Sequence, residues 1–298
     1  MRTFLLFGRG ISYTASPAIQ HAALCELGLP HRYEVVDVDA DGFAARAGAM
    51  RGSTGGANVT IPHKEAAFAL VDEASTDAEE MRAVNTIVVD GDRLIGHNTD
   101  LPAIEDELRA LVPGGARHAV VLGAGGASRA VQVALARQGT EVSVAQRRDG
   151  SLERVGELLA DADLLVNCTP VGTASGELPL DPALLREDLT VFDLIYRPTP
   201  TALVQAAREA GAQARAGGGM LVGQAWRSLA LWLEKDGVRV GPEVAPAMMA
   251  ALREELGAEV ELGAEVERDG LDWANGAELS GGRDGSGGAQ GRDGSGDV

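Results

Sequence analysis

Short apolar runs alternate with amphipathic stretches over the first hundred residues, a pattern that predicts strands followed by helices. The expected strands are Leu5–Gly8, Tyr33–Val38, Asn58–Ile61, Ala83–Val89 and Arg93–Gly96. The last two are joined at Asp90-Gly91, a favoured hairpin turn. The expected helices are Ala18–Leu27, Phe43–Met50 and Lys64–Val71. Strands that alternate with helices are typical of a mostly parallel α/β sheet.

A second series follows a helix expected from Pro102 to Leu111 and a Pro-Gly-Gly linker at 113–115. Its expected strands are His118–Leu122, Glu141–Ala145, Leu164–Val166 and Val191–Leu194. Strand, helix and strand in this rhythm are typical of a dinucleotide-binding domain. We therefore expect an α/β protein of two domains, one with a parallel or mixed sheet that binds substrate and one that is Rossmann-like.

The C-terminal region predicts two helices and then a change of composition. The helices, Met220–Leu233 and Ala245–Leu256, follow the last strand of the second series, and one or both could pack onto the first domain. The expected substrate-binding domain is 1–101 joined by 221–257, and the expected cofactor domain is 102–220. Residues 258–298 are rich in Gly, Ser and Asp repeats, which predicts a disordered tail without a catalytic role.

Composition narrows the class of partner. The chain has 298 residues, 45% hydrophobic residues and a net charge of −18. The tail holds ten acidic and three basic residues, or −7, so residues 1–257 carry the remaining −11. An acidic surface argues against nucleic acid and anionic membranes, which attract lysine and arginine. A small molecule is the expected partner, bound by a monomer or a homodimer.

Cysteines and the N-terminus carry little further signal. Cys25 and Cys168 are too few for a disulfide framework in a chain of this length, and no Cys/His cluster has metal-ligand spacing. No metal is therefore expected. The apolar run within Met1–Gly8 is too short for a signal peptide or a membrane span, so a soluble cytoplasmic protein is expected.

A glycine-rich loop opens the second series. Gly123, Ala124, Gly125, Gly126 and Ala127 follow an apolar strand and precede a helix. Glycines permit the turn and a close approach of the backbone, and a helix N-terminus offers N–H groups to a pyrophosphate. Nucleotide binding is the favoured interpretation, and an ordinary strand-to-helix turn is the alternative.

The residues after the next strand bear on the choice of cofactor. Gln146 stands where an NAD enzyme usually places an acidic residue, and Arg147 and Arg148 follow it. Two guanidinium groups could pair with a 2′-phosphate, which favours NADP. Asp149 leaves NAD open, and a solvated charge cluster is the remaining alternative.

A lysine and an aspartate are the candidates for proton transfer. Lys64 follows Asn58-Val59-Thr60 and a proline, and Asp100 follows the last strand of the first series. If both strand ends meet, the pair could move one proton. Alternatively, Lys64 is an ordinary surface lysine and Asp100 caps the next helix. Their occurrence with a cofactor loop and with Thr14 and Ser16 favours chemistry.

An ordered set of motifs resembles the signature of shikimate dehydrogenases over roughly residues 4–256. The motifs are Gly8 to Ser16-Pro17, Asn58-Val59-Thr60-Ile61-Pro62-His63-Lys64, Ala83-Val84-Asn85-Thr86, Gly96-His97-Asn98-Thr99-Asp100, Asn167-Cys168-Thr169-Pro170-Val171-Gly172, Asp193-Leu194-Ile195-Tyr196 and Met220-Leu221-Val222-Gly223-Gln224. The resemblance implies reversible NADP-linked reduction of 3-dehydroshikimate to shikimate, a step of aromatic amino-acid biosynthesis.

The resemblance also implies roles for single residues. Lys64 would be the proton donor and acceptor, with Asp100 beside it to orient it. Thr14 and Ser16 would bind the substrate carboxylate. The remaining polar contacts to the ring would come from Thr60, Asn85, Tyr196 and Gln224. The nicotinamide side would be lined by the segment Asn167-Cys168-Thr169-Pro170, and also by Ile195, Gly217 and Met220.

The chain departs from the family pattern at Arg9-Gly10, Tyr13, Thr14 and Leu101-Pro102. The threonine keeps the hydroxyl group that the carboxylate needs. Two alternatives are a quinate/shikimate or aminoshikimate dehydrogenase paralogue that uses NAD, and a regulator of the same fold without catalysis. The intact Lys64 and Asp100 pair argues against the regulator, as does the absence of a basic DNA-binding segment.

Overall fold

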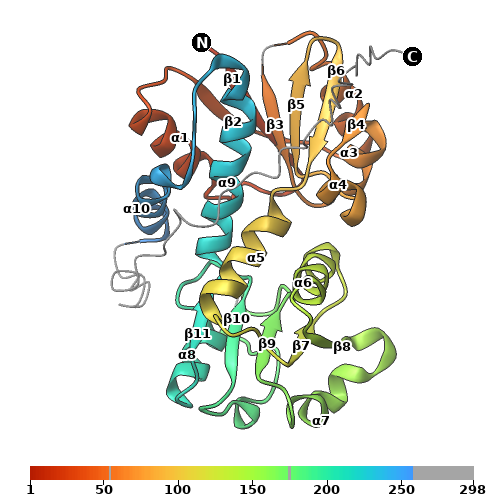
Figure 1. Cartoon of the computed structure of the whole chain (residues 1–298), viewed down its shortest axis with the longest axis vertical. Coiled ribbons are helices and arrows are strands. Elements are labelled where there is room, and N and C mark those ends of the chain that lie inside the picture. Colours follow the sequence, from red (N-terminus) through yellow and green to blue (C-terminus); the bar gives the residue numbers. More distant parts are fainter. Residues whose placement is uncertain (54, 174–175, 258–298) are drawn as a thin grey trace, which may run out of the picture.

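Two β-sheets lie one above the other and are connected by two helices, α5 (Asp100–Leu111) and α9 (Gly218–Leu233) (Figure 1). The computed structural model describes residues 1–53, 55–173 and 176–257. The tail predicted over 258–298 lies outside these described residues. The α/β fold class expected from the sequence is confirmed.

The first sheet is mixed, with the strand order β2-β1-β3-β5-β6-β4. Its strands are β1 (Thr3–Gly8), β2 (Arg32–Asp37), β3 (Gly56–Val59), β4 (Glu73–Ala74), β5 (Thr86–Asp90) and β6 (Arg93–His97). β1 runs parallel to β2 and β3, whereas β5 runs antiparallel to both β3 and β6. The expectation of a mostly parallel sheet is therefore only partly met, because the hairpin inserts β5 between two strands of the opposite direction.

Four helices follow the strands of this sheet: α1 (Ser16–Glu26), α2 (Ala40–Gly48), α3 (Lys64–Leu70) and α4 (Thr76–Met81). The pattern predicts neither α4 nor the two-residue strand β4. It also places the start of β5 three residues too early. Residues 83–85 precede the strand, and there the backbone N–H of Val84 donates to the Lys64 carbonyl and that of Asn85 to the His97 carbonyl.

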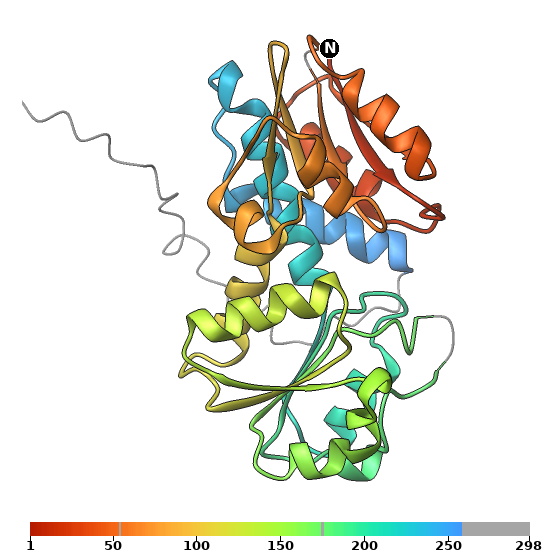
Figure 2. The same cartoon turned by 90° about the vertical axis from the view of Figure 1, so that its right-hand side faces the viewer.

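The second sheet is wholly parallel, with the order β11-β10-β9-β7-β8. Its strands are β7 (His118–Leu122), β8 (Glu141–Ala145), β9 (Leu164–Asn167), β10 (Thr190–Asp193) and β11 (Ala214–Ala216). One face packs against α5 and α6 (Gly126–Arg137), and the other packs against α7 (Val155–Leu159) and α8 (Ala202–Glu209) (Figure 2). The sequence pattern misses α8 and β11.

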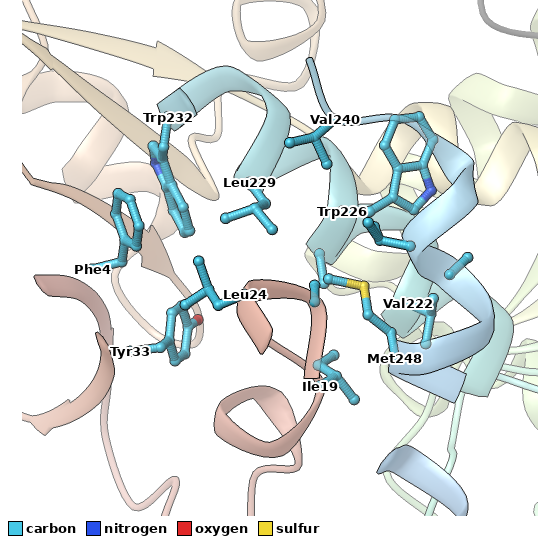
Figure 3. Packing of buried hydrophobic residues seen from close by; sticks show 14 of the residues in the cluster. Phe4, Ile19, Leu24, Tyr33, Val222, Trp226, Leu229, Trp232, Val240 and Met248 are labelled. Carbon is cyan, nitrogen blue, oxygen red and sulfur yellow. The ribbon is translucent and has the colours of Figure 1, made fainter. Parts of the chain in front are cut away.

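Both C-terminal helices, α9 and α10 (Ala245–Leu256), pack onto the first domain. Figure 3 shows the shared core, in which Trp226, Leu229 and Trp232 of α9 meet side chains of β1, α1 and α10. The Trp232 indole stacks on Phe4 with ring centroids 4.6 Å apart, and its Nε1 donates to the Ile87 carbonyl at 3.0 Å. Helix α9 is thereby fixed to the first sheet.

The proposed domain limits fall inside connecting helices. The limit at 101/102 lies in α5 and the limit at 220/221 lies in α9, so each helix contributes to both units. We keep these limits as a proposal. Among the described residues, no helix is both long and apolar enough to cross a membrane.

The packing of Trp232 predicts that Gly56 tolerates no side chain. A Cβ at Gly56 would lie 2.3 Å from Trp232 Cδ1, and stacking and a hydrogen bond hold this indole in place. Gly56→Ala should therefore lower the free energy of unfolding by about 1–3 kcal/mol, the range for overpacked cores. Urea denaturation measures this loss.

Gly48→Ala is the matched control, because a Cβ at Gly48 meets nothing within 4 Å. Its helical position predicts an unchanged stability or a gain of up to about 1 kcal/mol. A Gly56→Ala protein as stable as Gly48→Ala would contradict the packing described here.

Candidate active site

Lys64 and Asp100 meet at one edge of the first sheet. Lys64 opens α3 after the turn that follows β3, and Asp100 opens α5 after β6. Lys64 Nζ lies 2.6 Å from Asp100 Oδ2, with side-chain exposures of 30% and 13%. At the first turn of a helix, the Asp100 carboxylate also gains from the positive end of the helix dipole. The pair is reachable by a ligand and can exchange a proton with it.

The alternative in which Asp100 serves as a helix cap does not describe the structure. Thr99 occupies the N-cap position of α5, and its side chain makes no capping hydrogen bond. Asn98 Oδ1 accepts the N–H of Leu101 in the first turn at 3.2 Å. The Asp100 carboxylate accepts from Lys64 instead.

Asn85 stands directly before β5 with a fixed amide orientation. Its Oδ1 accepts the backbone N–H of Thr99 at 2.8 Å, and its Nδ2 donates to Thr99 Oγ1 at 3.0 Å. Because a backbone N–H can only donate, the oxygen and nitrogen of this amide cannot exchange places. The second amide hydrogen of Asn85 takes part in neither of these bonds.

Hydroxyl groups from both halves of the chain gather at the start of α1. Thr14 Oγ1 lies 3.0 Å from Ser16 Oγ. The Tyr196 hydroxyl, which belongs to the loop after β10, interacts electrostatically with the Thr14 side chain and the backbone of Ala15. Burial raises the pKa of Tyr196, and these two contacts oppose the rise. The predicted carboxylate-binding pair is therefore assembled together with Tyr196.

Thr60 lies at the end of β3, whereas Gln224 lies on α9. A Cβ on Gly8 would lie 2.6 Å from Thr60 Cγ2 and 2.7 Å from Ile11 Cδ1, so the loop after β1 packs against the end of β3. Gln224 lies on α9, where its Nε2 donates to the Leu221 carbonyl at 2.8 Å. The amide oxygen of Gln224 is the part of that group that a substrate hydroxyl can reach as donor.

The glycine loop has the backbone that nucleotide binding needs. Gly123 has a φ of +98°, a left-handed conformation that favours glycine. Helix α6 begins at Gly126, and a Cβ on Gly125 or Gly126 would meet nothing within 4 Å. Ala124, Gly125, Gly126 and Ala127 are all exposed. The N–H groups at the start of α6 are therefore open to an anion.

Ser128 supports this loop, and sequence reasoning missed it. Its fully buried Oγ donates to the Gly123 carbonyl at 2.7 Å and accepts from Gln132 Nε2 at 3.0 Å. A serine within the first turn after a glycine loop is the signal that could have indicated this support.

The charged residues after β8 are two exposed arginines and one aspartate that is held by hydrogen bonds. Arg147 and Arg148 are exposed within a single 3-10 turn. Asp149 accepts from the Ser151 side chain and backbone and from Gln146 Nε2 at 2.7 Å. These bonds, with the Ser151 hydroxyl first, lower the pKa of Asp149 to about 2. The amide N–H of Gln146 is thus committed to Asp149.

The predicted nicotinamide side brings three chain segments together. Thr169 Oγ1 donates to Asn167 Oδ1 at 2.7 Å, and Asn167 Nδ2 donates to Asp193 Oδ1 at 2.9 Å. The N–H of Gly217 donates to the Ile195 carbonyl at 3.0 Å. A Cβ on Gly217 would lie 2.2 Å from the Leu194 carbonyl oxygen, so a glycine is required there.

Met220 and Cys168 in the same region pack with hydrophobic neighbours. Burial raises the pKa of the Cys168 thiol, so this group stays protonated and is a poor nucleophile. Within the described residues, no three His, Cys, Asp or Glu side chains gather as a metal site requires. Lys64 and Asp100 are therefore the chemically distinctive groups of this site.

Comparison with known proteins identifies the family. The model of the shikimate dehydrogenase substrate binding domain matches residues 6–87. The shikimate dehydrogenase (NADP(+)) of Methylocella silvestris is 39% identical over 277 residues, covering 86% of this chain and 98% of that protein. The enzyme of the same name from Methanopyrus kandleri is 40% identical over 265 residues, covering 78% of this chain and 90% of its own.

Solved structures agree. Shikimate 5-dehydrogenase from Thermus thermophilus, in complex with NADP(H) and shikimate, superposes with a TM-score of 0.75 at 34% identity, covering 86% of this chain and all of that one. Quinate dehydrogenase from Corynebacterium glutamicum, in complex with NAD, gives a TM-score of 0.73 at 27% identity, covering 85% and 98%. With the matches in sequence, these show that the chain belongs to the shikimate dehydrogenase family.

Proposed function

We propose that the protein catalyses the reversible, NADP-linked reduction of 3-dehydroshikimate to shikimate. The observation that supports this most directly is the Lys64–Asp100 contact of 2.6 Å, in a chain whose relatives are named shikimate dehydrogenase (NADP(+)). Ketone reduction needs a proton donor as well as a hydride, and this pair is suited to supply one.

The glycine loop fits a dinucleotide. Its open space at Gly125 and Gly126 and the exposed first turn of α6 suit a pyrophosphate, which the helix N-terminus would hold. Thr169, Ile195, Gly217 and Met220 would border the nicotinamide. NADPH, when bound, supplies the hydride, whereas the proton and the orientation of the substrate must come from the protein's own side chains.

Lys64 is the proposed proton donor. As the ketone carbon is reduced, its oxygen gains negative charge and must be protonated. The ammonium group of Lys64 stabilises that charge and donates the proton, and it accepts the proton in the reverse direction. Asp100 orients the ammonium group through their hydrogen bond.

The other polar groups would orient the ring. Thr14 and Ser16, with Tyr196 across from them, would hold the substrate carboxylate. The second amide hydrogen of Asn85 would donate to a ring hydroxyl, and Thr60 and Gln224 would complete the set. A polyhydroxylated ring needs such partners, because each buried polar group left unpaired is costly.

NADP is the proposed cofactor over NAD. Arg147 and Arg148 are free of the carboxylate that follows them and can meet a 2′-phosphate. One observation favours NAD as the second candidate: Gln146 gives its amide N–H to Asp149, and this negative charge lies beside the predicted ribose site. A quinate or aminoshikimate dehydrogenase that uses NAD is the corresponding alternative function.

A steady-state assay of shikimate and of quinate, each with NADP and with NAD, tests the proposal. The highest kcat/KM is expected for shikimate with NADP. A higher kcat/KM for quinate with NAD would favour the alternative, and no turnover of any pair would refute both. We further propose a cytoplasmic monomer or homodimer, which light scattering after gel filtration would resolve.

Replacement of Lys64 tests its chemical role. Lys64→Ala should lower kcat by roughly 10²–10⁴-fold, the range for a lost general acid or base, with a smaller change in the KM of shikimate. Steady-state kinetics of the folded variant give both numbers. A kcat near that of the wild type would contradict the assignment of Lys64 as the proton donor.

Lys235→Ala is the matched control. Lys235 Nζ lies 2.6 Å from Asp90 Oδ1, the same contact length as in the Lys64 pair, but both side chains are about half exposed. An exposed pair of this kind contributes little to stability. We expect the control to keep its kcat.

The arginines of the cofactor loop give a second prediction. Each charge-assisted contact contributes roughly 1.5–3 kcal/mol, so Arg147→Ala/Arg148→Ala should raise the KM for NADP about a hundredfold or more and leave that for NAD nearly unchanged. Arg154→Ala is the control, since Arg154 is exposed on the next turn and its nearest carboxylate is Glu157. Equal kcat/KM for the two cofactors in the wild type would mean that Asp149 governs this loop.

A further inference from the structure

A network of buried polar side chains lies at the start of α5, next to the Lys64–Asp100 pair. It joins β2, β3, β5, α5 and α9, and every member is at most 5% exposed. Its members are Tyr33, Asn58, Asn85, Thr86, Thr99 and Ser228. Of these, Asn85 alone is a proposed ligand of the substrate.

Ser228 is the meeting point of this network. Its Oγ is fully buried and lies 2.9 Å from Asn58 Nδ2, 2.8 Å from Thr86 Oγ1 and 3.2 Å from Thr99 Oγ1. The same atom donates to the Gln224 carbonyl at 3.0 Å, one turn earlier on α9. One hydroxyl thus contacts two strand ends, the first turn of α5 and the turn of α9 that carries Gln224.

The orientation of the Asn58 amide is set by a carbonyl. Asn58 Nδ2 faces the Asn85 carbonyl at 3.1 Å, which can only accept, and the same nitrogen faces Ser228 Oγ at 2.9 Å and Thr86 Oγ1 at 3.1 Å. Asn58 Oδ1 accepts from the Tyr33 hydroxyl at 2.9 Å. The Gln224 carbonyl can only accept. Ser228 Oγ therefore lies between the Asn58 amide, which can donate to it, and the Gln224 carbonyl, which can accept from it. In its contacts with Thr86 and Thr99 either hydroxyl can be the donor.

Two threonines, Thr86 and Thr99, connect Ser228 to Asn85. Thr86 and Thr99 each contact Ser228 Oγ, and their hydroxyls also approach Asn85 Oδ1 at 3.0 and 3.2 Å. Thr99 also donates its backbone N–H to Asn85. The amide of Asn85 is thus held by groups that Ser228 in turn holds.

We propose that Ser228 is a positioning residue for this reaction: it holds the Asn85 amide and the Gln224 turn of α9 in the orientation that binds the ring hydroxyls. The inference rests on the proposed function, because it concerns the same substrate. Ser228 touches neither Lys64 nor Asp100 through any of these bonds, so its removal should weaken substrate binding more than proton transfer.

Ser228→Ala is the direct test. It removes the acceptor of Asn58 and frees the Thr86 and Thr99 hydroxyls to turn. The KM of shikimate should rise roughly 3- to 10-fold, the effect of about one neutral hydrogen bond. The KM of NADP should stay within about twofold, because the network makes no contact with the glycine loop or with Gln146–Asp149.

Gln20→Met is the matched control for a merely structural effect. Gln20 is fully buried, and its Nε2 donates to the Ala225 carbonyl of α9 at 3.0 Å, beside Gln224 but outside the network. This variant should lower the melting temperature as Ser228→Ala does, yet keep the KM of shikimate within about twofold. An equal rise of that KM in both variants would overturn the proposal, as would no rise in Ser228→Ala.

Thr86 provides a second pair of variants if Ser228→Ala fails to fold. Thr86→Val keeps the shape of the side chain and removes the hydroxyl, so it should raise the KM of shikimate as Ser228→Ala would. Thr86→Ser keeps the hydroxyl, so its KM of shikimate should stay near that of the wild type. A wild-type KM in Thr86→Val would refute the network's role. If the wild type itself turns over no shikimate, the proposed function fails, and this inference fails with it.

Discussion

The contact between Lys64 and Asp100 joins residues 36 positions apart, and it depends on the direction of two strands. β3 and β6 are both antiparallel to β5, so they run the same way on either side of it and end at one edge of the sheet. In the register of the sheet, Asn58, Thr86 and His97 lie in one row. From that row the chain continues past Asn58 to Lys64 on one side and past His97 to Asp100 on the other.

Two helices carry this arrangement to the second sheet. α5 begins with Asp100 and packs on α6, whose first turn adjoins the exposed glycine loop. Arg137, at the far end of α6, binds Asp77 of α4 at 2.8 Å and Glu105 of α5 at 2.9 Å, and Arg227 of α9 binds Asp106 of α5. The two units are therefore packed together beside the Lys64–Asp100 pair, which suits the proposed reaction between a bound substrate and a bound cofactor.

Sequence reasoning reached the long, strongly patterned elements and missed those that depend on tertiary contacts. β4 has two residues, too few for a clear period. The hairpin of β5 with β6 was expected, but the antiparallel pairing of β5 with β3 joins segments farther apart in sequence and was not. Lys64 and Asp100 could be paired in advance because motifs in order implied it. Ser228 could not, since a serine inside a helix gives no sign of the backbone or side chain it will meet, whereas Ser128 had a signal in its place just after the glycine loop.

The charge cluster after β8 shows the same limit. The sequence places Gln146, Arg147, Arg148 and Asp149 in order, but only the structure shows that Ser151 and Gln146 hold the aspartate. The sequence shows which residues are charged, whereas the orientation of their side chains depends on local hydrogen bonds. The proposed preference for NADP rests on that direction.

The most direct test of the central claim is a crystal structure of the protein with shikimate and NADP⁺ bound. The account predicts that Lys64 Nζ and an Asp100 carboxylate oxygen both lie within about 3.2 Å of the substrate hydroxyl that becomes the ketone oxygen. It also predicts that the carboxylate of shikimate meets Thr14 and Ser16. A shikimate molecule bound with that hydroxyl remote from Lys64, and facing other side chains, would contradict the account.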